Sequence, residues 1–318
     1  MNTTLEPKMG ELANLLRNGT GLDQLALVEQ VALLLYLKLL DQEEQQNTVD
    51  GSPTRLFPNQ AVRYRWSQWI TTMPEDMHRF VSSDVLPYMG SLSREALPVA
   101  AFFRDSKLLI DDPAVFARVV SLIEDIDLRT PILDDTKNML EHLLNRAQGD
   151  RRFGEFRTPP SLRQLMVTLL DPTPDDTICD FACGTGGFLI DAVDHMLSSQ
   201  PSSSHKPGTQ EAGATGPGWT DPTDVAASSA AFDNSIFGFD LSHRMTRIAI
   251  VNLMLHGVHN PHIMWGNSLD ELSSTTHRYS ALLSNPPMGL QVRGETVRLE
   301  RNLKTSDGDP GSANYRRE

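Results

Sequence analysis

The sequence contains little cysteine. Only two of its 318 residues are cysteines, Cys179 and Cys183, and no second thiol pair at metal-ligand spacing accompanies them. A disulfide scaffold or a structural zinc site would need more thiols than these two. The nine histidines form no His-x-x-x-His pair with an acid, so the sequence indicates no metal site. We expect a protein of a reducing, cytoplasmic compartment.

The sequence also lacks a long uninterrupted apolar run. Its most apolar stretch, residues 25–40, contains Glu29, Gln30 and Lys38 and is too short and too polar to span a bilayer. The N-terminus shows no signal-peptide pattern. We therefore expect no membrane association.

Basic residues are fewer than acidic ones in this sequence. The chain has 28 Lys and Arg against 41 Asp and Glu, which gives a net charge of −13. Affinity for nucleic acids comes largely from neutralising phosphates, so an acidic chain is not an obvious DNA-binding protein. If this protein acts on DNA, a local basic face or a basic partner must supply the attraction.

The pattern of apolar residues divides the chain in two. Helical spacing predominates up to about residue 148 and predicts a helical N-terminal domain over residues 1–148. Predicted helices in this domain cover 5–20, 21–45, 66–73, 76–90, 113–126 and 132–149. Beyond it, strands predicted within 176–182, 235–241, 262–269 and 279–289 alternate with helices over 161–171, 188–199 and 242–258.

Alternation of strands and helices is typical of a parallel, doubly wound sheet. We assign this second domain to residues 149–290. Residues 198–230 are rich in Ser, Gly, Pro and Thr and are predicted to form a flexible insertion. Residues 291–318 show no apolar period and are predicted to form a mobile tail.

Two of the predicted strands end in polar motifs. "DFACGTGG" places Asp180 just before a glycine loop, which suits a cationic or amino-bearing ligand better than a pyrophosphate. Asp240 ends the next strand, where an acid can bind ribose hydroxyls. The alternatives are an ordinary glycine-rich turn at residues 184–187 and a helix N-cap at Asp240.

The stretch "LSNPPMG" ends the last predicted strand. Neither proline can donate to a strand ladder, so the backbone after Asn285 is rigid and its carbonyls are free. The Asn285 side-chain oxygen and the Pro286 carbonyl then form a pair of acceptors for a planar amino group. Such a pair would orient an amine and polarise it for attack on an electrophile.

In this order the motifs resemble the S-adenosylmethionine-dependent DNA adenine methyltransferases, most closely the modification subunit of type I restriction–modification systems. "FGEFRTPP", "DFACGTGGFL", "FGFDLS", "GNSL" and "NPPM" are similar to successive motifs of that family. The resemblance covers nearly all of residues 5–290. It implies a helical domain followed by a Rossmann-like methyltransferase domain, which we expect to be incomplete at its C-terminal side.

The resemblance implies a site in two parts. The cofactor S-adenosylmethionine is expected to contact Glu155, Phe156, Arg157, Thr158, Pro159, Pro160, Asp180, Gly184, Thr185, Gly186, Asp240 and Asn267. The catalytic motif is expected to be Asn285, Pro286, Pro287 and Met288. The chain departs from the family where Met288 replaces an aromatic residue, Asn267 an aspartate and Pro160 an arginine.

The expected activity is methyl transfer to the N6 amine of adenine in DNA. The resemblance also implies partners: DNA, a specificity subunit, a restriction subunit and a second copy of the chain. Two alternatives remain open at the level of sequence. The chain is a shortened, catalytically poor remnant that acts as a binding module, or it methylates another planar amine, such as an RNA base or a protein glutamine.

Overall fold

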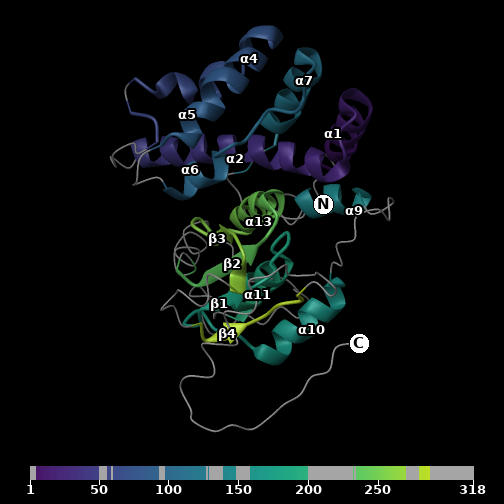
Figure 1. The fold of residues 1–318 in the computed structure, drawn as a ribbon, viewed down its shortest axis with the longest axis vertical. Coiled ribbons are helices and arrows are strands. Elements are labelled where there is room, and N and C mark those ends of the chain that lie inside the picture. The colour runs from purple at the N-terminus through teal and green to yellow at the C-terminus, as the bar shows by residue number, and fades with distance from the viewer. Residues whose placement is uncertain are drawn as a thin grey trace, which may run out of the picture.

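A computed structural model of the protein shows a helical part and a sheet part (Figure 1). The residues that it describes are 5–49, 56–58, 60–92, 97–126, 128, 139–147, 158–199, 232, 234–269 and 279–286. Most of the predicted insertion, residues 200–230, and the whole predicted tail lie outside these ranges. No helix in the described ranges is long and apolar enough to cross a bilayer.

Every regular element in the described residues of the first part is a helix, as the sequence predicts. Its elements are α1 (Leu5–Thr20), α2 (Gln24–Val49), η1 (Val62–Tyr64), α3 (Trp66–Trp69), α4 (Pro74–Phe80), η2 (Val81–Val85), α5 (Leu86–Gly90), α6 (Leu97–Phe103), α7 (Pro113–Glu124) and α9 (Met139–Ala147). The sequence does not predict helix α6, because seven residues are too few to establish an apolar period. The start of the helix predicted over 132–149 lies outside the described residues.

Helix α2 is the buried axis of the helical part. It begins after Asp23, whose carboxylate accepts the backbone N–H of Ala26 at 2.8 Å. The preceding helix ends at Thr20, and Gly21 makes the turn with φ +65°. Residues 26–37 of α2 are all buried, as expected for a helix that is apolar over most of its circumference.

In the described residues, the second part is built on a parallel sheet of four strands. Its strands are β1 (Ile178–Asp180), β2 (Ile236–Asp240), β3 (His262–Trp265) and β4 (Ala281–Leu282), in the order β3-β2-β1-β4. Helices α10 (Pro160–Leu170), α11 (Gly187–Ser199) and α13 (His243–Leu255) accompany them. The predicted alternation of strands and helices is confirmed.

The strand order creates a switch point beside β1. From β1 the chain moves to β2 and β3 on one side, and it then returns to place β4 on the other side of β1. All these pairings are parallel, so the carboxyl ends of the strands lie at one edge of the sheet. Open sheets of this kind bind ligands at that edge, outside the switch point.

Helix α13 belongs to both hydrophobic cores. Ile248, Val251 and Leu255 pack into the core of the helical part. Ala249 and Leu253 pack into the core of the sheet part. Figure 1 shows α13 between α2 and the strands. The domain boundary near residue 148 remains a prediction, and packing between the two parts is continuous through α13.

Candidate functional site

The glycine loop connects β1 to α11 at the carboxyl edge of the sheet. The backbone N–H of Cys183 donates to Phe239 O at 2.9 Å, so the loop stays beside β2 after β1 has ended. Gly184 and Gly186 have φ values of +53° and +86°, which other residues rarely adopt. A Cβ atom at Gly184 would meet nothing within 4 Å, so there is open space beside this backbone.

Asp180 lies at the end of β1, beneath the loop, and is only 1 % exposed. One of its oxygens accepts the N–H of Ala182 at 3.0 Å. Burial raises the pKa of Asp180 to about 6, and the nearby Asp240 carboxylate adds to the rise. No Lys or Arg in the described ranges pairs with this carboxylate. Asp180 is therefore a desolvated acid that favours a cationic ligand.

Asp240 fixes the glycine loop to the end of β2. Its Oδ2 accepts the N–H of Gly184 at 2.9 Å, and its Oδ1 accepts the N–H of Ser242 at 2.7 Å. Burial raises the pKa of Asp240 as well. The N-cap of α13 is Ser242, whose hydroxyl accepts the N–H of Met245 at 3.4 Å. The N-cap of this helix, which was the alternative role for Asp240, is therefore Ser242, two residues further along the chain.

Asn267 follows β3 at the same edge. The N–H of Gly266 donates to the Asp240 carbonyl at 3.0 Å, which brings the start of this turn beside β2. The side-chain oxygen of Asn267 accepts the N–H of Leu269 at 3.2 Å and so closes the turn. Part of the hydrogen-bonding capacity of Asn267 thus serves its own turn.

Asn285 lies just beyond β4. The N–H of Leu283 donates to Cys179 O at 3.1 Å, which keeps the strand exit alongside β1. The side-chain Nδ2 of Asn285 donates to Thr158 Oγ1 at 2.9 Å. Asn285 and Pro286 are both exposed. The structure therefore brings the Asn-Pro motif together with the segment that precedes α10.

That segment contains three of the predicted cofactor residues. Thr158 is partly buried, Pro159 is the N-cap of α10, and Pro160 is its first residue. The remaining predicted site residues lie outside the described ranges: Glu155, Phe156, Arg157, Pro287 and Met288.

Sequence reasoning misses two positions near the site. Arg163 of α10 is buried and forms an ion pair with Asp191 of α11 at 2.7 Å. Asn252 of α13 is fully buried, and its Nδ2 donates to the carbonyl of Thr185 in the glycine loop at 3.1 Å. The only signal in the sequence is a charged or amide side chain on the apolar face of a predicted helix.

Helix α10 turns its leucines outward. Leu162, Leu165 and Leu169 are 47 %, 54 % and 77 % exposed, whereas Arg163 and Val167 are buried. The apolar period of this helix correctly predicts a helix, and Val167 packs into the core of the sheet part. The ion pair between Arg163 and Asp191 lies on the same buried side.

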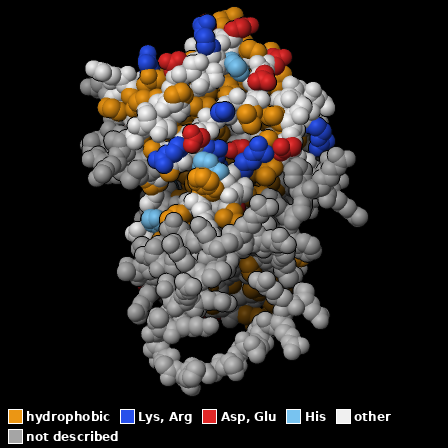
Figure 2. Space-filling model, in the orientation of Figure 1, with side chains coloured by type: hydrophobic (Ala, Val, Ile, Leu, Met, Phe, Trp, Pro, Cys, Tyr) orange, Lys and Arg blue, Asp and Glu red, His pale blue; other side chains and the backbone are white. Residues whose placement is uncertain are grey.

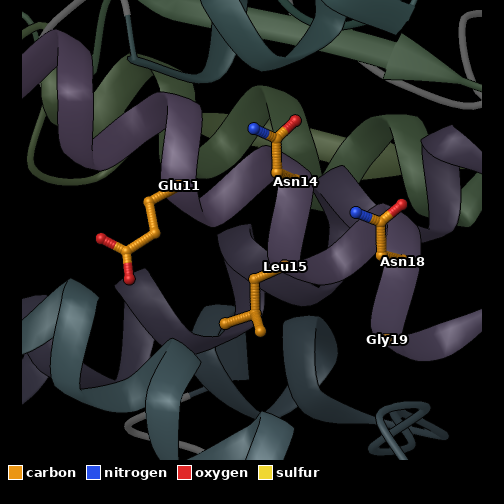
Figure 3. Close-up of a pocket in the computed structure, with 5 residues that line it drawn as sticks. All are labelled: Glu11, Asn14, Leu15, Asn18 and Gly19. Atoms are coloured by element: carbon orange, nitrogen blue, oxygen red, sulfur yellow. The ribbon is translucent and has the colours of Figure 1, made fainter.

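A separate hollow of about 580 Å³ lies along α1, away from the strand ends. Glu11, Asn14, Leu15, Asn18 and Gly19 line it (Figure 3). Glu11 pairs with Arg118 of α7, so its charge is already matched. None of the residues predicted for the functional site lies in this hollow.

Fold and site together define a class of protein. It is an open parallel α/β fold with a glycine loop, two acidic strand ends and an Asn-Pro strand exit at the switch point, as in Rossmann-like ligand-binding domains. Residues 133–315 match the N-6 DNA Methylase family, and the chain belongs to that family. Methyltransferases in general take their methyl group from S-adenosylmethionine.

Comparison with known proteins agrees with this assignment. The chain is 25 % identical over 297 residues to the EcoEI type I restriction enzyme methylase subunit of Escherichia coli. The aligned region covers 87 % of this chain and 55 % of that relative. The chain thus spans about half the length of the curated relatives that it matches.

Two solved structures share the fold. One comes from work on complex assembly and conformational transition of a type I restriction–modification system. It aligns with a TM-score of 0.71 at 24 % identity, over 90 % of this chain and 55 % of that chain. The other is a type I restriction–modification methyltransferase subunit from Streptococcus thermophilus. It has a TM-score of 0.60 at 14 % identity, over 94 % and 66 % of the two chains.

Proposed function

We propose that this protein transfers a methyl group from S-adenosylmethionine to the N6 amine of adenine in DNA. It would do so in the cytoplasm as the modification subunit of a type I restriction–modification system. The observation that carries the proposal is the meeting of Asp180, Asp240 and Asn285 at one sheet edge, with an open glycine loop between β1 and α11. Family membership narrows the reaction class to methylation.

The described residues fit the proposed cofactor. They provide no cation for the buried Asp180 carboxylate, and open space lies beside the Gly184 backbone. When bound, S-adenosylmethionine supplies an electrophilic methyl group on a positively charged sulfur. Asp180 would stabilise the positive charge of the ligand. Asp240 has lone pairs left after its two backbone bonds, which would accept ribose hydroxyls.

Asn285 would hold the target amine. Its Nδ2 is already bound to Thr158, so Oδ1 is the end of the amide that remains for a substrate donor. With the Pro286 carbonyl it would accept both hydrogens of an –NH₂ group and direct the nitrogen lone pair toward the cofactor. The N6 amine is buried inside a DNA duplex, so the adenine must be flipped out to reach Asn285.

The acidic net charge of the chain bears on how it would contact DNA. The chain carries a net charge of −13, and on the face in Figure 2 basic side chains lie among acidic ones over the helical elements. We propose that a specificity subunit supplies most of the phosphate contacts and reads the DNA sequence. A restriction subunit and a second copy of this chain would complete the assembly.

The test has two stages. Calorimetry with S-adenosylmethionine should give a binding isotherm for the folded chain. Transfer of labelled methyl groups to mixed-sequence DNA is then measured with the specificity subunit present. Activity should be lost in Asn285→Ala and kept in Asn18→Ala, which removes an exposed asparagine of α1 far from the sheet.

Three outcomes would count against the proposal. Absence of binding heat at millimolar ligand, with native circular dichroism, would exclude cofactor binding. Binding without transfer would favour the catalytically poor remnant. Transfer to RNA or to protein glutamine, but not to DNA, would favour the other planar amine.

A further inference from the structure

The side chain of Asn285 is held by a residue far away in the sequence. Its Nδ2 donates to Thr158 Oγ1 at 2.9 Å, across 127 positions of the chain. A carboxamide has a donor end and an acceptor end, and the two differ only by rotation about χ2. Because the donor end is bound to Thr158, the acceptor end is directed away from it.

The backbone of Thr158 is held in turn by Arg163. Nη1 of Arg163 donates to the Thr158 carbonyl at 3.3 Å. The Arg163 side chain is 8 % exposed, and its other nitrogens pair with carboxylates of Asp191 on α11 at 2.7 Å and Glu141 on α9 at 3.5 Å. A planar fork with several donors suits such an arrangement, which a single ammonium cannot reproduce.

The guanidinium also lies against the start of α11. A Cβ atom at Gly187 would come within 3.1 Å of Arg163 Cζ and Nε, so the glycine allows this close approach. Gly187 directly follows the glycine loop and is the first residue of α11. Arg163 thus contacts the helix that begins at the proposed cofactor loop, and through Thr158 it is connected to the proposed amine-binding residue.

We propose that Thr158 and Arg163 are positioning residues for methyl transfer. Thr158 Oγ1 orients the Asn285 amide so that Oδ1 faces the target amine, and Arg163 holds Thr158 in place against α11. The inference rests on the proposed function, because it assigns a role within the same site. It makes the geometry of Asn285 depend on α10, an element that contributes no reacting group.

The first experiment observes the hydrogen bond itself. The side-chain ¹H–¹⁵N signals of Asn285 are assigned by their disappearance in Asn285→Asp. One of these protons should be shifted downfield and exchange slowly in the wild type. It should lose both properties in Thr158→Val and keep them in Thr158→Ser. An unchanged signal in Thr158→Val would overturn the inference.

The second experiment separates positioning from binding. Thr158→Val should lower kcat by about tenfold, since small misplacements at a reacting centre are costly. Any rise in KM for S-adenosylmethionine or for DNA should be smaller than the fall in kcat, and Thr158→Ser should restore kcat. The matched control is Thr168→Val, the same substitution at the exposed far end of α10.

Arg163→Lys keeps the positive charge but loses the planar guanidinium with its several donors. It should lower kcat in the same way and weaken the Asn285 signal, with the circular dichroism spectrum unchanged. If the variant unfolds, Thr158→Val alone decides the question, because Val keeps the shape of Thr.

Failure of this inference and failure of the proposed function are distinguishable. An active wild type with unchanged kcat in Thr158→Val would overturn the positioning role and leave the function intact. A wild type without methyl transfer would overturn the function, while the nuclear magnetic resonance comparison would still decide whether Thr158 orients Asn285.

Discussion

Buried charges of the helical part differ from the two acids at the sheet edge in whether they have a partner of opposite charge. In the helical part, Lys38 Nζ donates to three carbonyls at the end of α7, those of Ile123, Glu124 and Ile126, at 2.7 to 3.0 Å. Glu29 of α2 pairs with Arg247 of α13 at 2.6 Å, and both side chains are under 8 % exposed. At the sheet edge, Asp180 and Asp240 are mostly buried with no cation from the described residues.

The difference separates structural charges from functional ones. A buried charge with all its partners contributes to a fixed arrangement of helices. A buried carboxylate without a cation lowers the stability of the free protein, and the loss is recovered only when a ligand provides the opposite charge. Unmatched burial of Asp180 is therefore the strongest physical sign that the sheet edge is a binding site.

The largest expected effect on stability comes from breaking the buried ion pair between Arg247 and Glu29. Arg247→Met should lower the free energy of unfolding by about 3 kcal/mol, because it removes one partner of a buried ion pair. It also removes donors to the carbonyls of Phe102 and Arg104. Urea denaturation followed by circular dichroism measures the change.

The control for this variant lies one turn away on the same helix. Arg244 also pairs with Glu29, at 3.2 Å, but its side chain is 42 % exposed. Arg244→Met should therefore cost less than about 1 kcal/mol. Equal losses in the two variants would contradict the role of burial.

The next largest effect is a gain in stability, expected when the charge of Asp180 is removed. Asp180→Asn should raise the stability of the ligand-free protein by about 2–3 kcal/mol at pH 7.5, because it removes a desolvated charge. The same change should abolish the binding of S-adenosylmethionine. Denaturation and calorimetry on the same preparation measure both.

The pH dependence provides the sharper form of this prediction. Folding raises the pKa of Asp180 to about 6 from its ordinary value of 3.8, so the wild type binds the extra proton between these values. Its stability should fall as pH rises through this window and level off above about 6. The advantage of Asp180→Asn should accordingly shrink from pH 7 to pH 4. An advantage that is constant with pH would contradict the assignment.

The smallest expected effect on stability is that of replacing either of two glycines with alanine. Gly184 and Gly21 have φ values of +53° and +65°, and a Cβ would meet nothing within 4 Å at either position. Substitution by Ala should cost about 1–2 kcal/mol of stability at each, through backbone strain alone. Only Gly184→Ala should also lose affinity for S-adenosylmethionine, because only that methyl group would enter the proposed site. Similar affinities in the two variants would place the ligand elsewhere.

Much of this arrangement can be predicted from the sequence. Three of the four predicted strands stop at a polar residue, so the sequence alone places Asp180, Asp240 and Asn285 at strand ends. Parallel pairing then brings those ends to one edge of the sheet. The motif order identifies the family for the same reason, since four of the five motifs mark the end of a strand.

The supporting contacts cannot be predicted in this way. The bond from Asn252 to Thr185 depends on how α13 docks on the glycine loop, and one sequence does not specify that packing angle. The buried face of α10 includes Arg163, whose pairing with Asp191 depends on how α10 docks on α11. Both depend on tertiary contacts between distant segments.

The sharing of α13 between two cores also affects the order of folding. During synthesis α2 leaves the ribosome early, but Arg247, the partner of its Glu29, follows 218 residues later. Until α13 arrives, the helical part exposes the apolar surface that α13 covers, and Glu29 lacks its partner. The segment that is made before α13 therefore completes its folding late, and the nascent chain would be vulnerable to aggregation throughout that interval.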